Sequence, residues 1–239
     1  MTSQHHPRPV AVVTGASRGL GAALTAELVR RDWHVVVDAR DAARLAAAVA
    51  ALPDSSTVTA LPGDVTDDDH RRAVARAVEQ LGGLDLLVSN ASTLGPSPLP
   101  PLSEHPLPAL LDVFEVNALA PIALLQLLLP SLRSRRGRVV HLSSDAAVEA
   151  YEGWGAYGAA KAALDHASRV LALEEPDVRV YSFDPGDMDT ELRRSAAPGE
   201  DLGDLPDPAT VVPSLLRLVE QDLASGRYTA AQLVQVVPA

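Results

Sequence analysis

The chain has 239 residues, of which 47% are hydrophobic and 21% charged, and this balance is typical of one globular domain with a large core. Its formal net charge of -11, without a stripe of basic residues, argues against a nucleic-acid partner. Because the chain has no cysteine, disulfides, thiolate nucleophiles and cysteine-based metal sites are excluded, and we expect no metal ion.

The sequence predicts no membrane partner. The polar start from Met1 to Arg8 lacks the apolar core of a signal peptide. The longest apolar stretch, 118–129, contains Pro121 and Gln126 and is too short to span a bilayer. We therefore expect a cytoplasmic protein.

Short apolar runs alternate with longer helical segments along the whole chain. We expect strands at 10–14, 34–38, 57–61, 84–89, 138–143, 178–183 and 232–237, and helices at 19–31, 41–52, 67–81, 109–129, 156–173 and 208–223. The strands lack in/out alternation, which is typical of parallel strands covered on both faces. The pattern predicts an α/β fold in which residues 1–239 form a single domain: a Rossmann-type doubly wound parallel sheet of about seven strands, flanked by helices on both faces.

Three features interrupt this pattern. Pro121 predicts a kink in the helix at 109–129. Residues 94–108, with six prolines, and residues 184–207, rich in proline, glycine and acidic residues, predict irregular segments. Both segments follow strands and should lie at the carboxyl edge of the sheet, where such folds bind ligands. We expect 187–206 to be a substrate-binding loop.

The first strand meets the first helix at Thr14-Gly15-Ala16-Ser17-Arg18-Gly19-Leu20-Gly21. Glycines allow the backbone to approach a phosphate closely, and the helix N-terminus offers unpaired N–H groups to it. The loop therefore predicts a dinucleotide site, with contacts from Gly15, Ser17, Arg18, Gly19, Leu20 and Gly21.

Tyr157 and Lys161 lie four residues apart on a predicted helix and therefore share one face. A phenol titrates near pH ~10, and a nearby ammonium group should lower its pKa and make it a competent proton shuttle. Lys161 is the one lysine among 20 basic residues, which argues for a role that arginine cannot fill. Ser143 and Ser144 end the fifth strand, and alternation sends their side chains opposite ways.

These motifs together resemble the short-chain dehydrogenase/reductase family over nearly the whole chain. The resemblance implies a catalytic set of Asn117, Ser144, Tyr157 and Lys161. In this set Ser144 holds the substrate oxygen, Lys161 binds the nicotinamide ribose, and Asn117 holds a water that resupplies protons. It also implies cofactor contacts from Tyr157, Lys161 and the residues Asp64, Val65, Asn90, Ala91, Pro185, Gly186, Met188 and Thr190.

The chain departs from the family pattern after the fourth strand. Ser89 and Ser92 replace the first asparagine and the glycine of its Asn-Asn-Ala-Gly motif. We expect neither departure to touch the catalytic set.

The tip of the second strand reads Val37-Asp38-Ala39-Arg40. By the family pattern, the acidic residue that selects NAD would stand at Ala39, while Arg40 and Arg18 stand where NADP-preferring members carry cations. Two guanidinium groups suit a phosphate dianion, so we expect NADP(H). A shift of one place would make Asp38 the selector and reverse this preference.

The sequence therefore predicts an NADP(H)-dependent oxidoreductase that transfers hydride between nicotinamide and a carbonyl or secondary alcohol of a small molecule. We expect a ketoreductase of biosynthetic metabolism. The alternatives are an NADP(H)-binding sensor without turnover and a reductase of C=N or C=C bonds. The resemblance also implies a homodimer or homotetramer through the helices at 109–129 and 156–173. The apolar stripe from Ala118 to Leu129 could equally be a buried core face.

Overall fold

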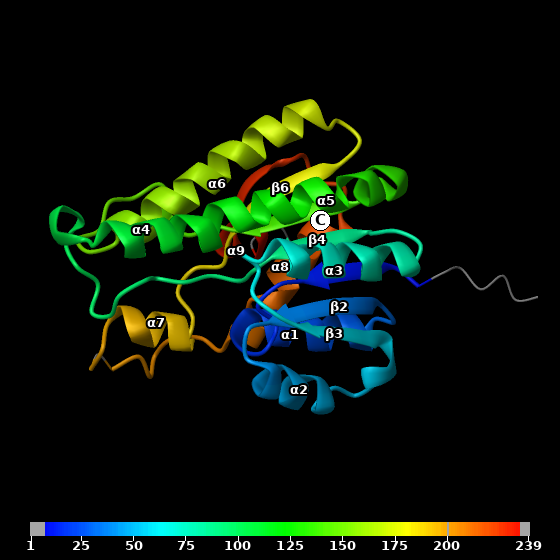
Figure 1. The fold of residues 1–239 in the computed structure, drawn as a ribbon, viewed down its shortest axis with the longest axis horizontal. Coiled ribbons are helices and arrows are strands. Elements are labelled where there is room, and N and C mark those ends of the chain that lie inside the picture. The colour runs from blue at the N-terminus through cyan, green and yellow to red at the C-terminus, as the bar shows by residue number, and fades with distance from the viewer. Residues whose placement is uncertain (1–7, 200, 235–239) are drawn as a thin grey trace, which may run out of the picture.

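The computed structural model describes residues 8–199 and 201–234, and its centre is a seven-stranded sheet in the order β3-β2-β1-β4-β5-β6-β7 (Figure 1). Every neighbouring pair of strands is parallel. The strands are β1 Val10–Val13, β2 His34–Ala39, β3 Val58–Pro62, β4 Leu86–Ser89, β5 Arg138–Leu142, β6 Arg179–Asp184 and β7 Gly226–Thr229. This topology confirms the predicted doubly wound α/β fold.

Helices cover both faces of the sheet (Figure 1). They are α1 Gly19–Arg30, α2 Ala42–Ala50, α3 Asp68–Gln80, α4 Leu107–Phe114, α5 Ala120–Arg135, α6 Gly155–Glu174, α7 Glu191–Ala196, α8 Val212–Glu220 and α9 Ala230–Val234. One apolar cluster packs α1 and α8 against the sheet, and a second packs α3 and α5 against the opposite face. Alternate residues of β1 belong to the two clusters, which explains why the strand is apolar throughout.

The strand order reverses between β1 and β4, which are direct neighbours in the sheet. The loops that follow these two strands lead away to opposite sides, and the crevice between them is the usual ligand site of such folds. The glycine loop follows β1, and Asn90 follows β4, so the topology brings both predicted cofactor motifs to this crevice.

The prediction of a last strand at 232–237 is wrong. The seventh strand is Gly226–Thr229, which pairs with β6 from Tyr181 to Asp184, and Ala230–Val234 forms the helix α9. Residues 235–237 of the predicted strand lie outside the described residues. β7 is half-buried and has the sequence Gly-Arg-Tyr-Thr, so it lacks the apolar run that strand prediction relies on.

The long helix is interrupted just before Pro121 rather than bent at it. Residues Glu115–Leu119 form a π-helical segment between α4 and α5. Pro121 has no N–H to donate to the carbonyl of Asn117, four residues earlier, so that carbonyl lacks its ordinary α-helical donor. The irregularity therefore falls on a predicted catalytic residue.

By length and composition, the helical run 107–135 is a candidate membrane span, contrary to the expectation from the apolar stretch alone. Its residues Leu124, Leu128 and Leu132 are buried in the core against the sheet. We interpret it as a core helix.

Candidate active site

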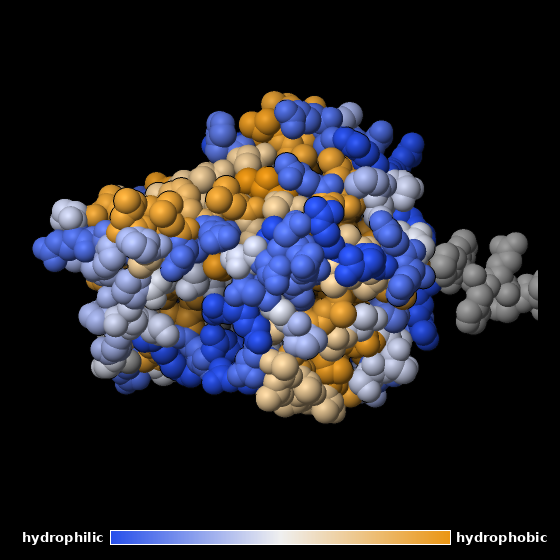
Figure 2. Space-filling model, viewed as in Figure 1, coloured by the Kyte–Doolittle hydropathy of each residue, from blue (hydrophilic) through white to orange (hydrophobic). Residues whose placement is uncertain are grey.

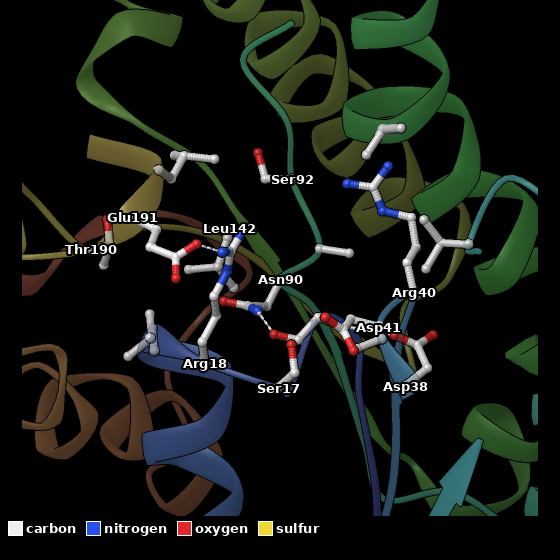
Figure 3. A pocket seen from close by; sticks show the side chains of 18 of the residues that line it. Ser17, Arg18, Asp38, Arg40, Asp41, Asn90, Ser92, Leu142, Thr190 and Glu191 are labelled. Carbon is white, nitrogen blue, oxygen red and sulfur yellow. Dashed lines mark hydrogen bonds and ion pairs between the residues drawn. The ribbon is translucent and has the colours of Figure 1, made fainter. Parts of the chain in front are cut away.

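A cleft of about 470 Å³ lies at the carboxyl edge of the sheet, over the crevice between β1 and β4 (Figure 3). Most of the predicted cofactor residues line it together with Tyr157 and Lys161: Gly15, Ser17, Arg18, Gly19, Leu20, Ala39, Arg40, Asp64, Val65, Asn90, Ala91, Pro185, Met188 and Thr190. Gly21, Gly186, Asn117 and Ser144 are not among the lining residues. Gly21 instead packs closely against Asn90, and Asn117 is fully buried.

The glycine loop is held in a conformation that suits a phosphate. Gly15 has a φ of +67°, and a Cβ atom there would lie 2.8 Å from the Cα of Ala91. A Cβ at Gly21 would lie 2.6 Å from Asn90 Nδ2, which itself donates to the Gly15 carbonyl at 3.1 Å. Arg18, the N-cap residue of α1, makes no side-chain capping bond, so the first N–H groups of α1 remain available to an anion. These features fit a dinucleotide pyrophosphate.

Asp38 lines the cofactor cleft, but its carboxylate is engaged by neighbouring groups. Its carboxylate accepts a hydrogen bond from Gly15 N at 2.9 Å, and His70 Nε2 lies 3.3 Å from its other oxygen. The side chain is 3% exposed. Burial raises the pKa of Asp38, while the hydrogen bonds from His70 and Gly15 oppose this shift. Asp38 therefore supports the glycine loop from below.

Three arginines gather at the outer part of the cleft. Arg18, Arg40 and Arg44 all line it. The pKa of Arg18 is lowered by partial burial and by the charges of Arg44 and Arg40. Arg44, in the first turn of α2, was missed by sequence reasoning, although it directly follows the strand tip that selects the cofactor.

A carboxylate from α7 reaches this arginine cluster (Figure 3). Glu191 forms ion pairs with Arg18 and with Arg44, whose Nη1 lies 3.1 Å from Glu191 Oε1. An anionic group thus already pairs with two of these three arginines.

Tyr157 and Lys161 lie on α6 at the inner end of the cleft, and both are buried. Lys161 Nζ donates to the Leu142 carbonyl at 2.6 Å and lies 5.5 Å from the centroid of the Tyr157 ring. Burial lowers the pKa of Lys161 to about 8, although the carboxylate of Asp165 opposes this shift.

The expected lowering of the pKa of Tyr157 is wrong for this structure. Burial raises that pKa to about 12, and the carboxylates of Asp184 and Asp145 raise it further, while hydrogen bonds with Ser92 and Ser144 lower it. The phenolate is desolvated in this site, and the Lys161 ammonium is directed to a backbone carbonyl rather than to the phenol oxygen. Tyr157 is therefore held in its protonated form at neutral pH.

The two serines at the end of β5 point in opposite directions, as strand alternation predicts. The Ser144 hydroxyl lowers the pKa of Tyr157 and donates to Asp145 Oδ1 at 2.8 Å. Ser143 is buried and donates to Asp165 Oδ2 at 2.7 Å. Ser144 is thus the serine at the phenol.

Arg227, on β7, supports this arrangement and was missed because the sequence did not predict that strand. Its Nη2 donates to the Ser144 carbonyl and to Asp184 Oδ2, at 2.9 Å in each case. It therefore fixes the backbone of Ser144 and partly offsets the negative charge of Asp184 beside Tyr157.

Asn117 is fully buried and is bonded to the loop that follows β4. Its amide donates to the Thr93 carbonyl at 2.7 Å, and its Oδ1 accepts from Thr93 N at 2.9 Å and from Ser92 Oγ at 3.1 Å. The Ser92 hydroxyl also lowers the pKa of Tyr157. The prediction that Ser92 leaves the catalytic set untouched is therefore wrong, because the fold brings this loop directly against α6.

The segment expected to bind substrate contains the short helix α7, which begins where Thr190 Oγ1 accepts a hydrogen bond from Arg193 N at 3.2 Å. Leu192 of this helix packs in one apolar cluster with Leu94 and Tyr157. Ser97 Oγ donates to the Ser195 carbonyl at 2.8 Å, which joins the two irregular segments.

Comparisons with known proteins agree with this geometry. Residues 9–201 match the short chain dehydrogenase family. Benzil reductase ((S)-benzoin forming) of Saccharomyces cerevisiae is 34% identical over 245 residues, which cover 95% of this chain and 89% of that protein. Sepiapterin reductase of Mus musculus is 34% identical over 201 residues, 78% of this chain and 77% of that protein.

Solved structures give the same result. A short chain dehydrogenase from Shigella flexneri 2a, in complex with NADP, matches with a TM-score of 0.87 and 28% identity, over 93% of this chain and 97% of that chain. The fold and the site thus define a nicotinamide-dependent oxidoreductase. The chain belongs to the short-chain dehydrogenase family, and it acts between carbonyl and alcohol groups of small molecules.

Proposed function

We propose that this protein is an NADP(H)-dependent ketoreductase in biosynthetic metabolism. The observation that carries the proposal is the placement of the buried Tyr157 at one end of a cleft whose other end presents three arginines. The inner end can protonate a carbonyl oxygen, and the outer end can bind a phosphate dianion.

The preference for NADP(H) is supported by the side chains around the strand tip. Asp38 is buried, and its carboxylate already accepts a hydrogen bond from Gly15 N and lies against His70. Ala39 offers no acidic group, while Arg18, Arg40 and Arg44 line the cleft. A cluster of guanidinium groups favours a 2′-phosphate over a 2′-hydroxyl.

Each catalytic side chain has a role in this proposal. The nicotinamide, when bound, supplies or accepts the hydride. Tyr157 donates its proton to the carbonyl oxygen, and Ser144 orients that oxygen. Lys161 binds the nicotinamide ribose and, with its pKa lowered to about 8, can return a proton toward Tyr157. Asn117 fixes the loop after β4, and its backbone carbonyl, without an ordinary helical donor, is available to a water that resupplies protons.

The raised pKa of Tyr157, about 12, suits the residue to donate a proton to a ketone oxygen at neutral pH. The reverse reaction, oxidation of an alcohol, would use its phenolate as the base.

The substrate class is suggested by the apolar surface near Tyr157. Leu94, Leu99, Trp154 and Leu192 cluster with the phenol, and the Trp154 ring meets the Tyr157 ring edge-on at 5.5 Å. This surface, between the segments 94–99 and 187–206, fits an aromatic or multi-ring ketone. The name of the similar yeast benzil reductase points to the same class, and benzil is therefore a suitable first test compound.

The cofactor test is a titration of the purified protein with NADPH and with NADH, followed by nicotinamide fluorescence. We expect tight NADPH binding that Arg40→Ala weakens and much poorer NADH binding. The control is Arg72→Ala, which removes an exposed arginine paired with Asp68 on α3. Preferential NADH binding would contradict the NADP(H) proposal.

Turnover assays on the same purified protein test the two alternative functions. Tight NADPH binding without turnover of any carbonyl, imine or enone would identify a sensor, and turnover of imines or enones alone would identify a reductase of C=N or C=C bonds.

We also propose that the protein forms a homodimer or homotetramer. Large apolar side chains are exposed along α4, the adjoining π-helical segment and α6, on a side of the molecule where Figure 2 shows apolar residues gathered. They are Leu107, Leu111, Leu119, Val170 and Leu173. Light scattering tests this proposal, and a monomer at micromolar concentration would contradict it. The cytoplasmic location stays a prediction.

A further inference from the structure

Arg227 of β7 contacts three segments of the candidate site that lie far apart in the sequence. Alternation along the strand sends Tyr228 into the apolar cluster that packs α1 and α8, and it sends Arg227 to the other face of the sheet, beside α6. There the guanidinium group donates to the Ser144 carbonyl and to Asp184 Oδ2, at 2.9 Å each, and to Asp165 Oδ2 at 3.2 Å. One side chain thus joins the ends of β5 and β6 to α6.

The bond to the Ser144 carbonyl acts on the substrate side of the cleft. Lys161 on α6 donates to the Leu142 carbonyl at 2.6 Å, and Arg227 on β7 donates to the Ser144 carbonyl. The backbone at the end of β5 is therefore held from two elements. Arg227 holds the residue whose hydroxyl is proposed to orient the substrate oxygen.

The bond to Asp184 acts on the cofactor side. Asp184 ends β6, and its other oxygen accepts from Gly186 N at 3.0 Å. Gly186 has a φ of +72°, so this bond supports a left-handed turn, and Pro185 within the turn lines the cleft. The charge of Asp184 also acts on Tyr157, which places the turn at the inner end of the cleft, away from the arginine cluster.

Two buried carboxylates share the charge of Arg227. The side chains of Asp165 and Asp184 are 9% and 8% exposed. Asp165 Oδ2 also accepts from Ser143 Oγ at 2.7 Å, while its Oδ1 is buried without a hydrogen-bond partner within the described residues. A buried carboxylate that loses its cation must move towards water or take up a proton. Loss of Arg227 should therefore release the ends of β5 and β6 together.

We propose that Arg227 is a positioning residue that holds Ser144 in a fixed place relative to the Pro185–Gly186 turn, against which the nicotinamide binds. The inference rests on the proposed ketoreductase function. Arg227 is not among the residues that line the cleft, and it acts through the Ser144 carbonyl and through Asp184. Lysine cannot replace it, because an ammonium group is a point charge and lacks the planar fork that meets two carboxylates and a carbonyl at once.

The kinetic test compares Arg227→Lys with the matched variant Arg179→Lys. Arg179 begins the neighbouring strand β6, at the opposite edge of the sheet, and pairs with the exposed Asp222 at 2.9 Å. We expect Arg227→Lys to lower kcat for ketone reduction about ten- to a hundredfold without raising the KM for the ketone, because a misplacement of about 1 Å can cost a hundredfold in rate. Arg179→Lys should keep the wild-type kcat. An unchanged kcat in Arg227→Lys, or a rise in KM alone, would overturn the inference.

A binding test separates the two ends of the cofactor. Adenosine 2′,5′-bisphosphate carries the 2′-phosphate of NADPH but no nicotinamide. We expect Arg227→Lys to weaken NADPH binding about tenfold, the effect of one hydrogen bond between charged groups, and to leave binding of the bisphosphate unchanged. Weakening of both ligands, or of neither, would contradict the role assigned to Arg227.

Hydrogen exchange in the protein without cofactor tests the same claim without turnover. In Arg227→Lys we expect faster exchange of the Gly186 amide, which is bonded to Asp184, and of the Ala147 amide, which donates to the Ser144 carbonyl at 3.1 Å. The amides of β1 should keep their wild-type rates. Faster exchange in β1 as well would show a role in global stability alone and refute the inference, as would unchanged exchange at Gly186 and Ala147. If the wild type reduces no ketone, the proposed function fails, and the exchange rates still decide whether Arg227 holds the two segments.

Discussion

The carboxylate of Asp38 accepts a hydrogen bond from the backbone N–H of Gly15 at 2.9 Å, so the acidic residue of β2 is bonded directly to the glycine loop. We therefore predict that Asp38→Ala weakens NADPH and NADH binding alike, by roughly tenfold, because a buried hydrogen bond to a charged group contributes about 1.5–3 kcal/mol. Fluorescence titration with both cofactors measures this, and Asp38→Asn, which keeps an acceptor for Gly15 N, should retain more affinity. A loss confined to NADH would show instead that Asp38 selects the cofactor.

Glu191 pairs with arginines to which the proposed function assigns the 2′-phosphate of NADP(H). It forms ion pairs with Arg18 and Arg44, which lie in the cluster assigned to the 2′-phosphate. We predict that Glu191→Gln tightens NADPH binding by up to about fivefold, since exposed ion pairs contribute about 0–1 kcal/mol. NADH binding should improve less. Glu152→Gln, an exposed glutamate outside the cleft lining, is the control. Weaker NADPH binding in Glu191→Gln would show that Glu191 helps to hold the cofactor.

His141 makes the stability of the fold depend on pH. Burial in β5, with the charge of Lys161 adding to it, lowers the pKa of His141 from 6.5 to about 3. Between these values the unfolded chain binds a proton that the folded chain does not, so stability falls as the pH falls below 6.5. The lost stability amounts to about 4–5 kcal/mol by pH 3, at 1.36 kcal/mol for each pH unit.

Urea unfolding from pH 7 to pH 4 measures this dependence. His141→Leu should show a shallower loss of stability than the wild type over this range, whereas His166→Leu, at an exposed position, should keep the wild-type slope. If the free energy of unfolding depended on pH equally in His141→Leu and the wild type, His141 would not be the source of the pH dependence.

Much of the fold could be predicted because its signals are local. The glycine loop, the strands without alternation and the Tyr157–Lys161 spacing are properties of short segments, and each predicts its own element. β7 could not be predicted in this way. Its four residues are half-buried, and pairing with β6, rather than an apolar run, makes the segment a strand.

The details of the site depend on contacts between segments far apart in the chain. Ser92 meets Asn117 across 25 positions of sequence, and Glu191 meets Arg44 across 147. No spacing rule predicts such pairs. The sequence therefore could not decide whether Asp38 selects NAD, and it did not reveal the roles of Arg44, Arg227 and Ser92 in the site. The pKa of Tyr157 was misjudged for the same reason, because burial, which the sequence does not give, outweighs the lysine.

The most direct test of the central claim is NADPH oxidation at 340 nm with benzil and related aromatic ketones, in the wild type and in Tyr157→Phe. Tyr157→Phe keeps the ring and removes the proton donor, and general acid catalysis typically contributes about 10²–10⁴-fold. We predict that kcat falls by at least about a hundredfold while NADPH affinity is unchanged. Ketone reduction by Tyr157→Phe at the wild-type rate would show that Tyr157 is not the proton donor.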